Sequence, residues 1–244
     1  VDNNKEFNHE EQAKILAQAE IYKKTTPWTI GKVLKDPNTW LIAIGWGLLN
    51  MVAQGINTQI FPAMLSYGFE RDFISLFLVI TAPIGFLWSW IGGIWDNKFG
   101  TKSASIWAVN VTCIVGALLW AFFPNSKVIA AIGICIAINS CAAGNNMTMS
   151  VTTSRWGRYD FVNAWTVIYF ISGIIKGAAS LVMSKLADLP GGYSTSYLFF
   201  AGFSVLSIIF IVLTKTNFVG RSDKQLMEDA QKANIKAAAN SARN

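Results

Sequence analysis

Apolar residues gather in six long blocks along this chain, and short polar joints separate the blocks. Each block has close to the roughly 20 residues that an α-helix needs to cross the hydrocarbon core of a bilayer. The pattern therefore predicts an all-α membrane protein with six transmembrane helices. The predicted spans cover residues 40–66, 73–95, 103–123, 128–151, 161–186 and 195–214.

Polar segments flank these spans. Residues 1–38 are predicted to form a cytoplasmic segment, in which apolar residues recur at helical spacing from Glu10 to Tyr22 and indicate a short amphipathic helix. Residues 39–214 form the predicted six-helix bundle. Residues 215–244 are polar and rich in alanine, which favours a cytoplasmic C-terminal tail with a helix that frays.

Composition agrees with a protein that lies in a membrane. The chain is 52% hydrophobic and only 14% charged, against about 25% charged residues in an average soluble domain. A soluble fold of this size cannot bury that much apolar surface, so a cytosolic enzyme, a secreted disulfide scaffold and a nucleic-acid module are excluded. Cys113, Cys135 and Cys141 lie inside apolar blocks without metal-binding spacing, and we expect small buried hydrophobic residues and neither a metal nor a cofactor.

Basic residues are distributed unequally between the two ends of the predicted helices, which predicts their orientation. Cytoplasmic loops of membrane proteins carry an excess of Lys and Arg. We therefore place both termini on the cytoplasmic side of a cell membrane. The cytoplasmic side would hold Lys23, Lys24, Lys32, Lys35, Lys98, Lys102, Arg155, Arg158, Lys215, Arg221 and Lys224, and the other side Arg71, Lys127 and Lys185.

Amide side chains recur along the first predicted span. Asn50, Gln54 and Asn57 stand at positions i, i+4 and i+7, which places them on one helical face. Such amides can join neighbouring helices by hydrogen bonds, or they can line a water-filled path. We favour the path, because hydrogen bonding between helices needs fewer amides.

The fourth predicted span is also polar, in contrast to two of its neighbours. Asn139, Asn145 and Asn146 lie among small residues, so they are expected to face the interior of the bundle, where they contact either a substrate or a neighbouring helix. The spans over 103–123 and 195–214 are almost purely apolar, and we expect them to be lipid-facing support.

The fifth predicted span carries the clearest candidate site. Trp165, Tyr169, Ser172 and Lys176 stand at i, i+4, i+7 and i+11, on one stripe of the helix. Lys176 lies about 22 Å from the cytoplasmic end, in the outer half of the span. A charge at this depth marks a functional site by default, although a lysine can also extend its stem to water. We favour a site at Lys176 that binds an anion. We interpret Lys185 as a lysine that extends its stem to water.

The joint between the second and third spans contains a recognisable loop. Gly92 is followed by Asp96, Lys98, Gly100 and Lys102. This loop resembles the signature loop of the major facilitator superfamily, which joins the second and third helices of each six-helix half. We expect Gly92 to let two helices approach closely, Asp96 to cap a helix N-terminus or pair with a cation, and the lysines to fix the loop at the membrane surface.

Other segments resemble the same superfamily in the order that it requires. Residues 35–40 resemble the start of its seventh helix, Gly157-Arg158 the loop before its eleventh, and residues 190–193 the turn before its twelfth. The resemblance covers residues 32–214. It implies the C-terminal half of a twelve-helix transporter, whose partners are the N-terminal six-helix half, the lipid bilayer and a small-molecule substrate.

Within the superfamily the pattern is most similar to the oxalate/formate antiporters and the monocarboxylate carriers. Those proteins hold a carboxylate with a cation in their C-terminal half, and Lys176 falls in the matching eleventh helix. The second span has no arginine between Asp72 and Asp96 to hold a second carboxylate. The resemblance therefore implies a secondary active transporter that moves a small organic anion, such as a monocarboxylate, by alternating access and without a cofactor.

Two other classes of function are a membrane enzyme and a protein that works only as a dimer. A membrane enzyme is not expected, because His9 is the only histidine of the chain and no metal or Ser–His site can form in the spans. A half-length carrier, or a membrane receptor or assembly protein that works only as a dimer, is the alternative. Val1 in place of an initiating methionine suggests instead a piece cut from a longer protein.

Overall fold

The computed structural model describes residues 13, 16–17, 19, 27–123, 126–230 and 232, and every regular element within them is a helix. The amphipathic helix expected over residues 10–22 lies largely outside these residues, and the described ones among them are helical. In the tail, a helix covers residues 223–230, whereas residues 233–244 lie outside the described part.

The described residues confirm the predicted all-α architecture. Among the described residues, six helical segments are long and apolar enough to cross a membrane. Two of these segments are composite: α5, η1 and α6 follow one another without a loop, and so do α8 and α9. The elements are α2 (Ile30–Lys35), α3 (Pro37–Ser66), α4 (Arg71–Phe99), α5 (Thr101–Ser103), the π-helix η1 (Ala104–Val111), α6 (Thr112–Phe122), α7 (Lys127–Trp156), α8 (Phe161–Gly177), α9 (Ala179–Ala187) and α10 (Tyr193–Leu213).

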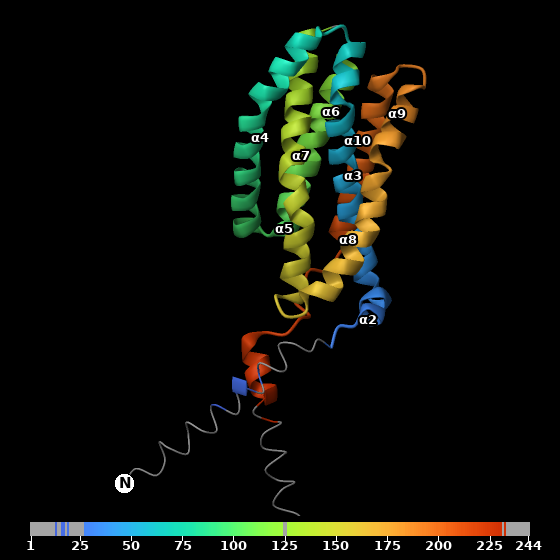
Figure 1. Cartoon of the computed structure of the whole chain (residues 1–244). Coiled ribbons are helices and arrows are strands. Elements are labelled where there is room, and N and C mark those ends of the chain that lie inside the picture. The colour runs from blue at the N-terminus through green and yellow to red at the C-terminus, as the bar shows by residue number, and fades with distance from the viewer. Residues whose placement is uncertain are drawn as a thin grey trace, which may run out of the picture.

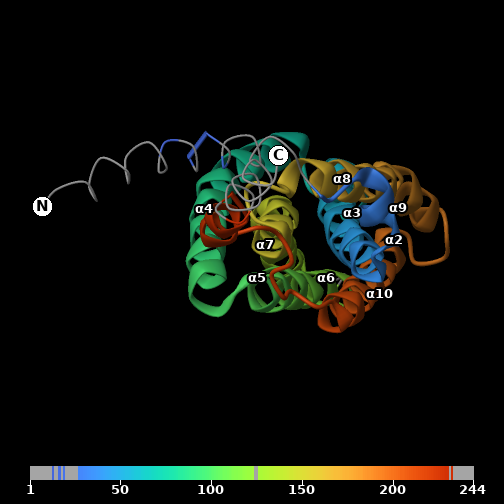
Figure 2. The ribbon, with the colours of Figure 1, turned by 90° about the horizontal axis from the view of Figure 1, so that it is seen from below.

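The long helices stand side by side as an antiparallel bundle (Figure 1). Viewed along the bundle, α4 packs outside α7, whereas α8 packs against α3 (Figure 2). Of the six spans, α3 is the most buried and α4 the least. We call the end where α3 begins and α10 ends the α2 end, which is the lower end in Figure 1, and the opposite end the far end.

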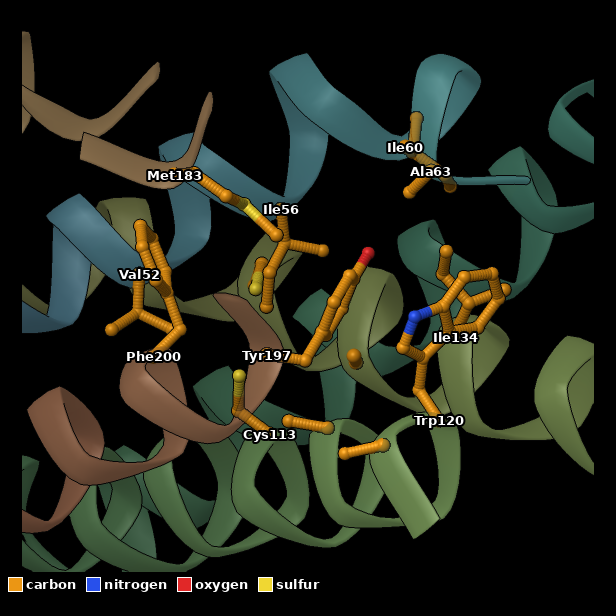
Figure 3. Close-up of a cluster of buried hydrophobic side chains, with 14 of the residues drawn as sticks. Val52, Ile56, Ile60, Ala63, Cys113, Trp120, Ile134, Met183, Tyr197 and Phe200 are labelled. Atoms are coloured by element: carbon orange, nitrogen blue, oxygen red, sulfur yellow. The ribbon is translucent and has the colours of Figure 1, made fainter. Parts of the chain in front are cut away.

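Two apolar clusters hold the bundle together. The larger one lies in its far half, where Trp120, Tyr197 and Phe200 from α6 and α10 pack against α3 and α7 (Figure 3). The other surrounds Trp46 and Trp156 nearer the α2 end. The prediction of buried cysteines is confirmed for two of the three residues, because Cys135 is only half-buried. Cys113 and Cys141 belong to the larger cluster.

The two spans expected to be lipid-facing support are more buried than α4 and the α8–α9 segment. Both spans contribute polar groups to the interior. The Asn110 side chain of η1 donates hydrogen bonds to Ser105 O (3.0 Å) and to Ser207 Oγ of α10 (3.3 Å), and Ser207 donates to Gly45 O of α3 (2.8 Å). That expectation is therefore confirmed only in part: apolar side chains such as Trp107 and Ile209 are exposed, whereas others of the same spans pack in the core. Hydropathy does not distinguish a side chain that faces a protein core from one that faces lipid.

Candidate functional site

A cavity of about 330 Å³ lies between α3, α7 and α8. We call it the lysine cavity. Asn50 follows Pro37 by 13 residues in the 30-residue helix α3, so the cavity lies near the middle of the bundle. The lining residues are Asn50, Asn146, Thr148, Met149, Trp165, Tyr169, Ser172, Gly173 and Lys176.

The whole predicted stripe of α8 lies along this cavity. Trp165, Tyr169, Ser172 and Lys176 line it, and Asn50 joins them from α3. Their spacing of four, three and four residues keeps them on one face of α8, because an α-helix turns once in 3.6 residues. The sequence therefore predicted which side chains of α8 lie together.

Two of the polar lining residues also bind neighbouring helices. The Ser172 hydroxyl donates to Ala43 O (2.9 Å) and joins α8 to α3. The Asn50 amide donates to Trp46 O (2.8 Å) and to Thr148 Oγ1 of α7 (2.8 Å). These hydrogen bonds fix the walls, and they occupy groups that could otherwise donate to an anion. Lys176 is the only charged residue among the described lining residues.

Two other predicted residues lie in a second cavity, of about 450 Å³, between α3, α4 and α7. Asn57 and Asn139 line it together with Thr81 and Ser89 of α4. Asn57 shares a helical face with Asn50, but it lies two turns, or about 10 Å, farther along the axis. The structure thus separates residues that the sequence analysis assigned to a single site.

Three further amides, Gln54 and Gln59 of α3 and Asn145 of α7, remain to be placed. Gln54 lines neither of these two cavities, and the side chain of Asn145 lies outside the described residues. Gln59, near the far end of α3, donates to Ser180 Oγ (2.9 Å) and accepts from Tyr193 Oη (3.0 Å). For Gln59 the observed role is hydrogen bonding between helices.

Asn146 lines the lysine cavity, in agreement with its expected position in the interior, but sequence reasoning missed three other lining residues. Thr148 and Met149 come from α7, whose sequence does not show which face meets α8. Gly173 follows Tyr169 by one helical turn, so its position on the stripe was a signal that could have been used. Lys185 lies elsewhere: its side chain is 74% exposed and pairs with Asp188 at 3.5 Å.

The residues that resemble the signature loop form close contacts with two other helices, α7 and α10. A Cβ atom at Gly92 would lie 2.8 Å from Ala143 Cβ of α7, so the expected close approach of two helices is confirmed. Gly100 ends α4 with a φ of 82°, a left-handed conformation that favours glycine. Lys102 donates to Val212 O (2.9 Å) and Thr214 O (2.8 Å), and it satisfies carbonyls at the C-terminal end of α10.

Asp96 has different partners from those expected. Its carboxylate accepts hydrogen bonds from Thr101 Oγ1 (2.7 Å) and from Ser150 Oγ of α7 (2.5 Å). It forms neither an N-terminal cap nor one of the ion pairs found among the described residues. The Ser150 hydroxyl of α7 binds Asp96 where a cation or a helix N-terminus was expected. The sequence of the loop alone could not show this contact, because Ser150 lies on another helix. Lys98, the other basic residue of the loop, lies over the Phe99 ring (5.3 Å).

An unpredicted set of ion pairs and hydrogen bonds binds the segment 214–221 across the α2 end of the bundle. We call this segment and its ionic contacts the tail clasp. Arg155 of α7 pairs with Asp36 (2.7 Å), the residue before α3, and also donates to Lys215 O (3.0 Å). Arg221 pairs at 2.9 Å with the fully buried carboxylate of Asp160, the residue before α8. The clasp therefore connects the ends of α3, α7 and α8.

The described residues contain no group of three or more His, Cys, Asp or Glu side chains that could hold a metal ion. No protein-family model matches this chain, and no curated protein matches it either. The candidate site therefore has to be interpreted from its own residues.

Proposed function

We propose that this chain is one six-helix half of a secondary active transporter of the major facilitator type, and that Lys176 binds the carboxylate of a small organic anion. The observation that carries the proposal is the position of this lysine. It lines a cavity near the middle of an apolar bundle, together with polar residues from three helices. Ionisable residues at such depth are costly and typically mark a substrate or ion pathway.

The exposed helices support a second half as the partner. The least buried spans are α4 and the α8–α9 segment, and each of them borders one of the two polar cavities. In transporters built from two repeats, the substrate site lies at the interface of the repeats near the middle of the bilayer. A second six-helix unit over these helices would enclose both cavities.

The distribution of charge supports an orientation in a cell membrane. Lys32, Lys98, Arg155 and Lys215 lie at the α2 end, with other basic residues. An excess of basic residues marks the cytoplasmic side. We propose that the α2 end, and with it the two tails, faces the cytoplasm.

Uptake of monocarboxylates into vesicles that contain the complete transporter tests the proposal. Lys176→Ala should abolish uptake, because the cation that balances the carboxylate in a low-dielectric site is lost. Lys185→Ala is the matched control, since it removes an exposed lysine of the same span. Equal uptake by Lys176→Ala and the unaltered protein would refute the role of this lysine.

A further inference from the structure

Three aromatic side chains stack along α8 and lead to the lysine cavity. The ring centroids of Phe161 and Trp165 lie 5.5 Å apart at 15°, and those of Trp165 and Tyr169 lie 5.0 Å apart at 30°. Tyr169 is 59% exposed although it lies two turns inside the helix. Aromatic residues are common where a helix meets the membrane surface, but that preference does not account for Tyr169 at this depth.

Beyond Tyr169 the stripe contains a gap. Gly173 follows one turn later, and no atom lies within 4 Å of the position that a Cβ would take there. Lys176 follows three residues after Gly173, so Tyr169 and Lys176 are about 10 Å apart along the helix axis. A flat molecule can therefore lie over Gly173, with the tyrosine ring at one end and the ammonium group at the other.

The wall of the cavity formed by α7, opposite α8, also suits a flat molecule. Met149 of α7 lines the cavity and is 51% exposed. Methionine is flexible, and its sulfur makes favourable contacts with the edges of aromatic rings. The volume of about 330 Å³ lies near the lower end of the range for small-molecule sites, roughly 300–1,000 Å³. An acid as small as acetate would fill little of it.

We infer that the lysine cavity selects planar aromatic monocarboxylates: the ring stacks on Tyr169 over Gly173, and the carboxylate binds Lys176. This inference rests on the proposed function and adds the class of substrate. A single carboxylate matches the single charge of the described lining residues. Stacking on an aromatic side chain contributes about 0.5–1.5 kcal/mol, which corresponds to roughly 2- to 12-fold in affinity.

Four probes separate ring, planarity and charge in a thermal-shift assay on the complete purified protein, because a ligand that binds only the folded state raises its apparent stability. Benzoate should bind more tightly than cyclohexanecarboxylate, which has a similar size without an aromatic face, by roughly 2- to 12-fold. Acetate should bind more weakly than both. Benzamide, which lacks the charge, should give no shift.

Two variants test the assigned positions. Gly173→Ala adds a methyl group in open space and favours the helix, so it should fold; it should weaken benzoate binding and leave acetate binding unchanged. Tyr169→Leu should weaken benzoate binding roughly 2- to 12-fold. Phe170→Leu is the matched control, because Phe170 is 69% exposed and does not line the cavity.

The outcomes distinguish this inference from the proposed function. Equal affinities for benzoate and cyclohexanecarboxylate, unaffected by either variant but lost in Lys176→Gln, would overturn the aromatic selectivity and leave the carboxylate site in place. If none of the three carboxylates binds, or if their binding does not depend on Lys176, the proposed function fails as well. Weaker benzoate binding in Tyr169→Leu, with no change in Phe170→Leu, supports the inference even where Gly173→Ala fails to fold.

Discussion

The tail clasp predicts that one arginine controls the stability of the C-terminal segment at the α2 end. The Arg155 side chain is only 8% exposed and pairs with Asp36, which is 16% exposed. Its guanidinium also donates to Lys215 O and Asn217 O. The change Arg155→Met keeps an apolar stem but leaves one carboxylate and two carbonyls without this partner.

The size of the effect follows from these contacts. Removal of one partner from a buried ion pair costs about 3–5 kcal/mol. The lower value applies here, because Asp36 retains some contact with solvent and still accepts the N–H of Asn38 (3.0 Å). This cost falls on the junction of α3 and α7, whereas the segment itself loses the guanidinium hydrogen bonds to Lys215 O and Asn217 O. Hydrogen bonds to a charged group contribute about 1.5–3 kcal/mol each, and a loss of about 3 kcal/mol corresponds to roughly 100-fold in the equilibrium between the bound and released segment.

Hydrogen exchange measures this equilibrium directly. The N–H groups of Val219 and Gly220 donate to Arg155 O, and that of Lys215 donates to Asn38 Oδ1. In Arg155→Met, their exchange should accelerate by roughly 100-fold if the segment opens locally. Unchanged exchange over residues 214–221 would refute the assignment of the clasp to Arg155.

Two further variants control this experiment. Arg158→Met removes an ion pair with Asp223 in which both side chains are more than 60% exposed (68% and 65%), and it should change exchange in the segment little, because exposed pairs contribute little. The double variant Arg155→Met with Asp36→Asn should recover part of the lost stability, since it no longer leaves an unpaired carboxylate.

Three other predictions follow from the described contacts. Gly92→Ala should destabilise the bundle by about 1–3 kcal/mol in thermal or chemical unfolding, because its Cβ would press on α7, whereas Gly93→Ala, with no atom within 4 Å, should not. Ser150→Ala should cost about 1.5–3 kcal/mol through the loss of its hydrogen bond to the Asp96 carboxylate. Burial raises the pKa of Tyr67 above 10.0, although a hydrogen bond from a serine hydroxyl opposes the shift. The stabilisation of the folded state that accompanies this raised pKa is fully present below pH 10 and is lost as the pH rises through the pKa of the folded state. The fall in Tm above pH 10 should therefore be smaller in Tyr67→Phe.

The spans could be predicted from sequence because their signal is local. A run of about 20 apolar residues predicts a membrane helix whatever surrounds it. The ends were less accurate, since polar residues beyond the apolar core continue the helix: α4 extends to Phe99, past the expected end at 95, and α7 to Trp156, past 151. The break between α8 and α9 had no proline to mark it.

The π-helix η1 shows why other features could not be predicted. The Asn110 side chain binds Ser105 O, five residues earlier, and Ser207 of α10. Part of this arrangement depends on a helix almost one hundred residues later, so no local pattern predicts it. The same limit applies to Arg155, which the sequence presents only as a basic residue at the end of a span.

The tail clasp and the lysine cavity involve the same three helices, at different depths. The clasp joins the ends of α3, α7 and α8 through Asp36, Arg155 and Asp160, and the cavity lies between those helices deeper in the bundle. Met149 precedes Arg155 by six residues, or about 9 Å along α7. Benzoate affinity in Arg155→Met therefore separates two physical cases. An unchanged affinity means that packing in the middle of the bundle fixes the cavity, because Met149, the lining residue nearest to Arg155 on α7, is about 1.7 helical turns from the lost ion pair. A changed affinity means that the helix ends and the cavity move as one unit.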